Sequence, residues 1–268
     1  MDIFKINREI AYTGQVGVRR KGFCMDYIAR KRTILNEITQ AQHKQARAQG
    51  ERITCTKGCF FCCLLHVEAT IQECEAIVFY LYQDEYALKS FLGNYPRWRN
   101  RIRENGDIFK ELGELSREVF AFQFEQGEIG ADYIVLKQEA FSKAQARYAR
   151  QNIYCPFLED NLCSIYEVRP YNCAGFYATT PPDCCNPLNP HEPTIYRSKL
   201  PGEVILDLTF YHESLRAPVF TFMPLAVYEI LSGGYGYLST MPGFDNLEYE
   251  FMKDPEVRLY LDAYTQSR

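Results

Sequence analysis

The sequence of 268 residues has little histidine, a single tryptophan and no surplus of positive charge. Its formal net charge at pH 7 is −4. Because sequence-independent binding of nucleic acid requires an excess of Lys and Arg, this charge argues against a nucleic-acid partner. The four His residues follow no metalloprotease spacing, and neither a Gly-x-Ser-x-Gly motif nor a phosphate-binding loop occurs. No catalytic residue is indicated by these motifs.

Long uninterrupted hydrophobic runs are also missing. The least polar stretch, residues 217–244, contains Pro218, Pro224 and several glycines, which would break a membrane-spanning helix. We expect this stretch to form buried core or the wall of an apolar pocket. Residues 1–7 lack the basic and apolar segments of a secretory signal, so we expect a cytoplasmic location, where thiols stay reduced.

Thiols are abundant instead. The chain has 11 Cys, an odd number that cannot all pair as disulfides, and 47% hydrophobic and 24% charged residues. The last two values are typical of a globular protein with a buried core and exclude a disordered chain. Many cysteines in a reducing compartment indicate metal binding or redox chemistry more often than disulfides.

Hydrophobic periodicity predicts a mainly helical chain with a small irregular, β-hairpin-containing cysteine-rich region (α+β), forming one domain over residues 1–268. Gly93, Asn94 and Pro96 are expected to interrupt the helical pattern. Helices are expected over residues 26–48, 67–91, 97–124, 132–148, 223–231 and 255–264. Residues 203–211 alternate like a strand, and the Pro- and Cys-rich residues 154–193 are expected to lack long elements.

Four cysteines lie within nine residues: Cys55, Cys59, Cys62 and Cys63. Gaps of three and two residues allow the thiolates of one loop to converge on one centre, and Gly58 supplies backbone freedom. The adjacent cysteines direct their side chains differently, so they can serve different sites. Buried free thiols are the alternative interpretation.

A second set of cysteines follows at Cys155, Cys163 and Cys173. These wider gaps suit a hairpin that turns near Asp160–Asn161 and presents thiols to the first loop. We expect Cys184 and Cys185 to extend the patch, whereas Cys24 and Cys74 are expected in the core. His66 is expected to be a surface or helix-start histidine, with a role as a ligand or proton relay as the alternative.

Both sets together resemble the cysteine-cluster proteins described as a zinc- or iron-chelating domain. The resemblance covers mainly residues 55–63 and 155–176, through Cys-x3-Cys-x2-Cys-Cys, Cys-Pro-Phe-Leu, Cys-Ser-Ile-Tyr and Arg-Pro-x2-Cys. Some members are called iron–sulfur oxidoreductases, and flagellin lysine methylases carry a similar cluster. The chain departs from the family in having Ala174 where Arg usually follows the last Cys. The resemblance implies metal binding by Cys55, Cys59, Cys62, Cys63, Cys155, Cys163 and Cys173.

We favour a 4Fe–4S cluster over zinc as the cofactor. Structural zinc prefers paired compact Cys-x2-Cys units, whereas ligands from remote segments and a Cys-Pro doublet are typical of iron–sulfur sites. Seven matched cysteines exceed the four that one cluster needs, which suggests a second site with three thiolates. Arg169 is expected to donate hydrogen bonds to cluster sulfurs, with a salt bridge to Glu167 as the alternative.

The sequence thus predicts a metal-binding protein that works in electron transfer or a cluster-dependent modification, with a protein or small-molecule redox partner. A non-enzymatic structural zinc protein is the first alternative. The second is a radical S-adenosylmethionine enzyme, since Cys55, Cys59 and Cys62 have the required spacing and Gly233–Gly234 could contact that cofactor. The second set of cysteines would then be unexplained.

Overall fold

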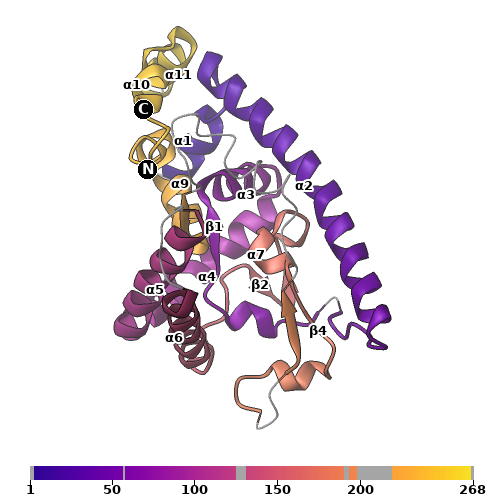
Figure 1. Cartoon of the computed structure of the whole chain (residues 1–268). Helices are drawn as coiled ribbons and strands as arrows, with labels where there is room; N and C mark the ends of the chain where they lie inside the picture. The colour runs from indigo at the N-terminus through magenta and orange to yellow at the C-terminus, as the bar shows by residue number, and fades with distance from the viewer. Residues whose placement is uncertain (1–2, 57, 125–130, 190–192, 198–218, 267–268) are drawn as a thin grey trace. The chain divides into compact units, whose positions relative to one another are not determined.

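The computed structural model describes residues 3–56, 58–124, 131–189, 193–197 and 219–266. These residues are mainly helical, with three short two-stranded sheets, so the predicted fold class is confirmed (Figure 1). Contacts divide the chain into two compact units. Unit 1 comprises Met1–Ile34, Ala69–Glu85 and Gly202–Arg268, and unit 2 comprises Leu35–Glu68 and Tyr86–Pro201. The single-domain organisation stays a prediction.

The helices α1 (Ile3–Ile10) and α2 (Gly14–Ala48) open the described chain. Figure 1 shows α2 as one continuous helix, and it begins well before the expected residue 26. Its first amides are capped by distant carboxylates: Gln15 N donates to Asp254 Oδ2 at 2.8 Å and Gly14 N to Glu256 Oε2 at 3.1 Å. Such partners satisfy the free N–H groups of a helix start, and the local sequence cannot reveal them.

Unit 1 is built around α3 (Ile71–Gln83) and α9 (Met223–Leu238), which pack against each other. The helices α1 and α10 (Leu247–Lys253) also pack on α9, and α11 (Pro255–Gln266) follows α10. Strands β1 (Glu68–Thr70) and β6 (Phe220–Phe222) pair just before α3 and α9. The apolar stretch after residue 217 thus supplies a core helix, as predicted.

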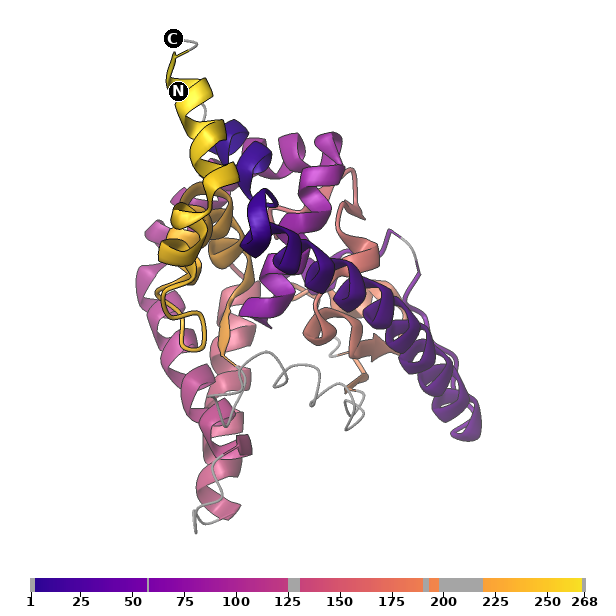
Figure 2. The ribbon, with the colours of Figure 1, turned by 90° about the horizontal axis from the view of Figure 1, so that it is seen from above.

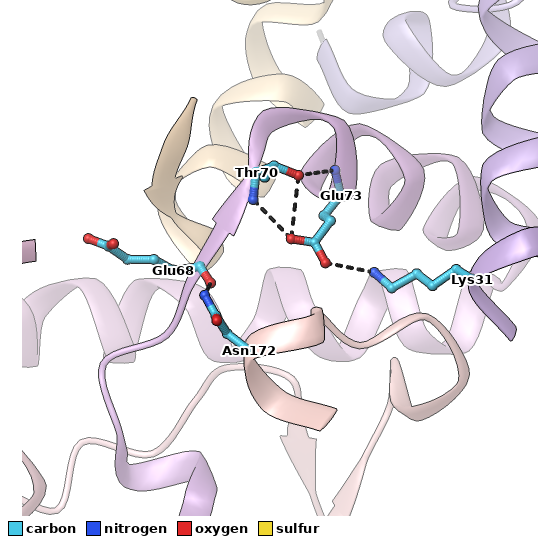
Figure 3. Close-up of polar contacts among 5 residues, drawn as sticks. All are labelled: Lys31, Glu68, Thr70, Glu73 and Asn172. Atoms are coloured by element: carbon cyan, nitrogen blue, oxygen red, sulfur yellow. Dashed lines mark hydrogen bonds and ion pairs between the residues drawn. The ribbon is translucent and has the colours of Figure 1, made fainter. Parts of the chain in front are cut away.

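The first turn of α3 is fixed by a capping box and a buried ion pair (Figure 3). Thr70 N donates to Glu73 Oε2 at 3.0 Å, and Glu73 N donates to Thr70 Oγ1 at 3.2 Å. The Glu73 carboxylate also pairs with Lys31 of α2, which lies in unit 1. One turn later Glu75 pairs with Arg20, so two buried cations of α2 bind α3.

Unit 2 contains α4 (Glu85–Glu104), α5 (Gly106–Phe124) and α6 (Ala131–Ala149). Figures 1 and 2 show α5 and α6 side by side as a helical hairpin, in agreement with their many contacts. The expected interruption at residues 93–96 was wrong, because α4 runs through Pro96. Its buried face, including Phe91 and Trp98, holds the helix against the rest of unit 2 despite the lost backbone hydrogen bond.

The remainder of unit 2 consists of short elements, as predicted. Strands β2 (Leu158–Glu159) and β3 (Leu162–Cys163) form an antiparallel hairpin that turns at Asp160–Asn161. Both turn residues have positive φ, 48° and 63°, which is typical of a two-residue type I′ turn. The other elements are η1 (Phe61–Leu64), η2 (Tyr166–Val168), α7 (Tyr171–Ala174), η3 (Pro182–Cys185) and the antiparallel pair β4 (Phe176–Ala178) and β5 (Ile195–Arg197).

Two further expectations concern a strand and membrane-spanning helices. The strand expected over residues 203–211 lies outside them. None of the helices they form is both long enough and apolar enough to cross a lipid bilayer.

Candidate metal centre

The two cysteine-bearing segments of unit 2 lie against each other. Cys155 N donates a hydrogen bond of 2.8 Å to Cys63 O, so the backbone that starts the second set contacts the end of the first. At the other end of the loop, Thr54 N donates to Ala178 O at 2.9 Å. The short helices η1 and η3 are also in contact. Segments far apart in the sequence thus bring their thiols to one region.

Side chains from neighbouring elements hold the backbone around this region. Gln42 Nε2, on the part of α2 in unit 2, donates to Ala174 O at 3.1 Å and so fixes the end of α7. Asn172 Nδ2 donates to Glu68 O at 2.7 Å, as Figure 3 shows. These amides bind main-chain carbonyls near Cys173, which restrains the segment that carries this thiol.

One group of thiols consists of Cys55, Cys59, Cys62 and Cys185. Burial raises the pKa of Cys185 to about 11, and the neighbouring thiols of Cys55, Cys59, Cys184 and Cys62 raise it further. Burial likewise raises the pKa of Cys55, although Ala178 N donates to its Sγ at 3.2 Å and opposes the rise. Cys185 therefore joins the three cysteines of the first loop.

A second group consists of Cys62, Cys63, Cys155 and Cys163. The Cys63 thiol donates a hydrogen bond to Cys62, which lowers the pKa of Cys62 to about 7 and raises that of Cys63. Burial raises the pKa of Cys155, and the nearby Cys163 adds to this rise. Cys62 affects the pKa of thiols in both groups and is therefore the residue that the two groups share.

Arg169 lies beside the second group. Its Nη1 donates to Tyr166 O at 2.8 Å, and its guanidinium lies 3.8 Å from the centre of the Tyr166 ring. The positive charge lowers the pKa of Cys62, after the larger effect of the Cys63 hydrogen bond, and opposes the burial that raises the pKa of Cys163 to about 11. Arg169 is thus placed to stabilise thiolates, and its predicted hydrogen bonds to cluster sulfurs stay a prediction.

All eleven cysteines are free thiols, so no pair is joined as a cystine. Cys24 and Cys74 are fully buried and belong to unit 1, which confirms that they are core residues. Cys173 is half-buried in α7, and its role as a ligand stays a prediction. The sequence places Cys185 only in the wider patch, because its spacing from Cys173 matches no compact motif, and the folded chain brings it near the first loop through the contact of η3 with η1.

Residues between the first loop and α3 contribute two titratable groups, the buried His66 and the half-buried Glu68. His66 is only 4% exposed, which contradicts a surface position, and burial lowers its pKa to about 3, so the imidazole is neutral. The Gln145 side chain binds both the N–H and the carbonyl of His66, each at 2.9 Å. Burial raises the pKa of Glu68 to about 7, although a hydrogen bond from Ser116 lowers it.

The donor set suits a thiolate-binding metal in its chemistry and location. Cysteine sulfur is the ligand of both zinc and iron–sulfur sites. Within the described ranges, however, no three Cys, His, Asp or Glu side chains are gathered closely enough to hold an ion in the arrangement observed. Binding therefore requires the thiols of a group to approach one another further.

Comparisons with known proteins identify no relative of this chain. No family model, curated protein or solved structure matches the chain. The resemblance to the cysteine-cluster family thus depends on the spacing of its motifs and stays a prediction.

Proposed function

We propose that this chain is an iron–sulfur protein that binds a 4Fe–4S cluster through cysteines of unit 2. The observation that supports this proposal is the meeting of free thiols from residues 55–63 and 155–185, linked by the hydrogen bond from Cys155 N to Cys63 O. A 4Fe–4S cluster requires four thiolates, and the sulfurs of remote segments are its usual ligands.

Four cysteines form the preferred ligand set for this cluster: Cys55, Cys59, Cys62 and Cys185. Unlike the seven cysteines that the family resemblance implies, this set includes Cys185 and leaves out Cys63, Cys155, Cys163 and Cys173. Cys185 is preferred because η3, which carries it, contacts η1, and because thiols of the first loop raise its pKa. The remaining thiols Cys63, Cys155 and Cys163 then form a three-thiolate set, suited to a second metal or to a ligand with an open position.

The surroundings suit a redox centre of this kind. Phe60 contacts Phe61 and Tyr154, with ring centroids 4.9 Å and 5.9 Å apart, so aromatic rings cover part of the first loop. Rings of this kind exclude water and lower the local dielectric constant. Arg169 supplies a positive charge that offsets the charge of the thiolates. A bound cluster would supply one-electron chemistry, for electron transfer or for a modification reaction with a redox partner.

Anaerobic purification with analysis of iron, acid-labile sulfide and zinc tests the proposal. We expect brown protein, absorbance near about 400 nm, and iron and sulfide in equal amounts, as a 4Fe–4S cluster requires. Colourless protein that contains zinc alone would refute the iron–sulfur assignment and favour the structural zinc alternative. Protein that contains neither metal after reconstitution with iron and sulfide would refute metal binding altogether.

Two substitutions make the test specific to the site. Cys62→Ser should remove most of the iron, because Cys62 interacts with thiols of both groups. Cys74→Ser is the matched control, since this thiol is fully buried in unit 1 and should leave the iron content unchanged. Equal iron loss in both variants would indicate a general loss of folding.

The radical S-adenosylmethionine alternative is tested on the same preparation. Reductive cleavage of S-adenosylmethionine by the reconstituted protein would favour that alternative. The described chain after Cys63 runs mainly through consecutive helices, α3 to α6, whereas those enzymes are built from repeated strand–helix units. We therefore expect no cleavage.

A further inference from the structure

Unit 1 contains a cavity whose lining includes no cysteine among the described residues. The cavity has a volume of about 100 Å³ and is lined by residues of α1 and the turn after it, and of α3, α9 and α10. One water needs roughly 10–15 Å³ of such space, so the cavity has room for several waters or for one small organic molecule. It is thus large enough to be a binding site for a small ligand.

Aromatic rings form two corners of this cavity. The rings of Tyr12 and Tyr82 have centroids 6.2 Å apart and planes at 75°, and those of Tyr235 and Phe251 are 4.6 Å apart at 79°. Edge-to-face contact is the usual packing of aromatic pairs, and these four rings also give the cavity wall aromatic surface, which attracts cations. The Tyr235 hydroxyl donates its proton to Ala11 O at 2.5 Å, so towards a ligand its oxygen acts as an acceptor.

A break in α9 shapes the wall of the cavity. Gly234 has φ 54° and ψ −137°, a conformation that residues with a Cβ rarely adopt. The Asn7 amide donates to Leu231 O and Ser232 O, each at 2.9 Å, and so binds two carbonyls next to the break. Both N–H bonds of Asn7 are thus used by backbone carbonyls, so any polar contact of this lining residue with a ligand would be through its Oδ1 acceptor.

The charged residues that line the cavity are acidic. Glu75 is paired with Arg20, and Glu248 contributes a carboxylate from α10. A Cβ on Gly236 would lie 3.1 Å from Glu248 Oε1, so the absence of a side chain lets this carboxylate lie against α9. No Lys, Arg or His belongs to the part of the lining that the structure describes.

We infer that this cavity binds a small organic ammonium ion with a short apolar chain. The aromatic corners attract a cation, the Glu248 carboxylate balances its charge, and the acceptors of Asn7 and Tyr235 suit its N–H donors. An anion would meet a carboxylate and no basic group, and a neutral alcohol would gain less from the rings. The inference is independent of the metal centre, because every residue that carries it belongs to unit 1.

Titration of the whole protein with n-butylammonium, n-butanol and butyrate, followed by ligand-observed NMR, tests this inference. We expect saturable binding of butylammonium, at least about fivefold weaker binding of butanol, and none of butyrate, because a cation–π contact is worth about 1 kcal/mol. Butanol that binds as tightly as butylammonium would overturn the proposal, and so would the absence of saturable binding by butylammonium.

Two matched substitutions on α10 locate the site. Glu248→Gln should weaken the binding of butylammonium by about two- to fivefold and leave that of butanol unchanged, as expected for an exposed ion pair. Glu250→Gln is the control, because this exposed residue lies on the same helix, pairs with Arg19 and does not line the cavity. Equal affinities of the two variants for butylammonium would refute the assigned site.

Tyr82→Leu tests the aromatic contribution separately. Leucine keeps an apolar wall and removes the ring, so butylammonium should lose more affinity than butanol does. A parallel loss for both ligands would show that Tyr82 contributes only apolar surface, which would contradict the proposed attraction of the cation by this ring. Circular dichroism and thermal unfolding of the variant check that the protein remains folded.

Discussion

Replacing Lys31 with methionine tests how far unit 1 depends on the buried ion pair at the start of α3. Lys31 Nζ lies 3.1 Å from Glu73 Oε1, and the two side chains are 1% and 2% exposed. Methionine preserves the length and the apolar stem of the side chain but removes the positive charge. The Glu73 carboxylate would then stay buried without that cation, which costs about 3–5 kcal/mol when one partner of a buried pair is removed.

The remaining contacts of Glu73 favour the lower end of this range. Thr70 N still donates to the carboxylate at 3.0 Å, so part of its hydrogen bonding survives in the variant. We therefore expect the free energy of unfolding to fall by about 3 kcal/mol. Adding Glu73→Gln removes the second charge, keeps a carbonyl acceptor for Thr70, and should restore all but about 1–2 kcal/mol of the loss.

Urea unfolding followed by circular dichroism measures these changes. Lys110→Met provides the control, because Lys110 and Glu114 form an exposed pair with side chains 78% and 52% exposed. This control should change the free energy of unfolding by less than about 0.5 kcal/mol. If Lys31→Met costs no more than the control, or if the double variant is less stable than Lys31→Met, the reasoning from burial is refuted.

Three further predictions follow from single side chains. The folded pKa of Glu68, about 7, exceeds the usual carboxyl value, so the free energy of unfolding should fall as pH rises from 5 to 8. Urea unfolding of Glu68→Gln at both pH values should show this decrease reduced by roughly 2–3 kcal/mol. Iron analysis of anaerobically purified protein should show a large loss for Cys185→Ser and a smaller one for the adjacent Cys184→Ser; equal losses would contradict the assigned ligands. Gly234→Ala should destabilise the protein by about 1–3 kcal/mol in thermal unfolding, whereas Gly22→Ala in open helical surroundings should stabilise it by about 0.5–1 kcal/mol.

Features that depend on neighbouring residues could be predicted from the sequence. The hairpin turn at Asp160–Asn161 was predicted correctly, because these residue types adopt positive φ without help from the rest of the fold. The core positions of Cys24 and Cys74 were predicted because both stand apart from the cysteine clusters and Cys74 lies within a helical pattern. The segments around Cys63 and Cys155 were also expected to meet, and their backbones do so.

Features that depend on distant partners could not be predicted. α4 continues through Pro96 because aromatic residues of its buried face, such as Phe91 stacked on Phe157 at 4.3 Å, outweigh the local signal to end the helix. The interaction of Cys185 with the first loop arises from the packing of η3 on η1, for which the spacing of the cysteines gives no signal. His66 looked like a surface histidine because its burial depends on α5 and α6, where Phe109 and Tyr148 contact its ring.

The capping of α2 by Asp254 and Glu256 has a consequence for the order in which the chain can fold. The carboxylates that bind the first amides of this helix follow them by 239 and 242 residues, so during synthesis they leave the ribosome long after the helix itself. Until then the amino end of α2 lacks its partners and frays in water. Ordering of this end of the helix is therefore a late step, which becomes complete only when the α10–α11 junction docks onto it.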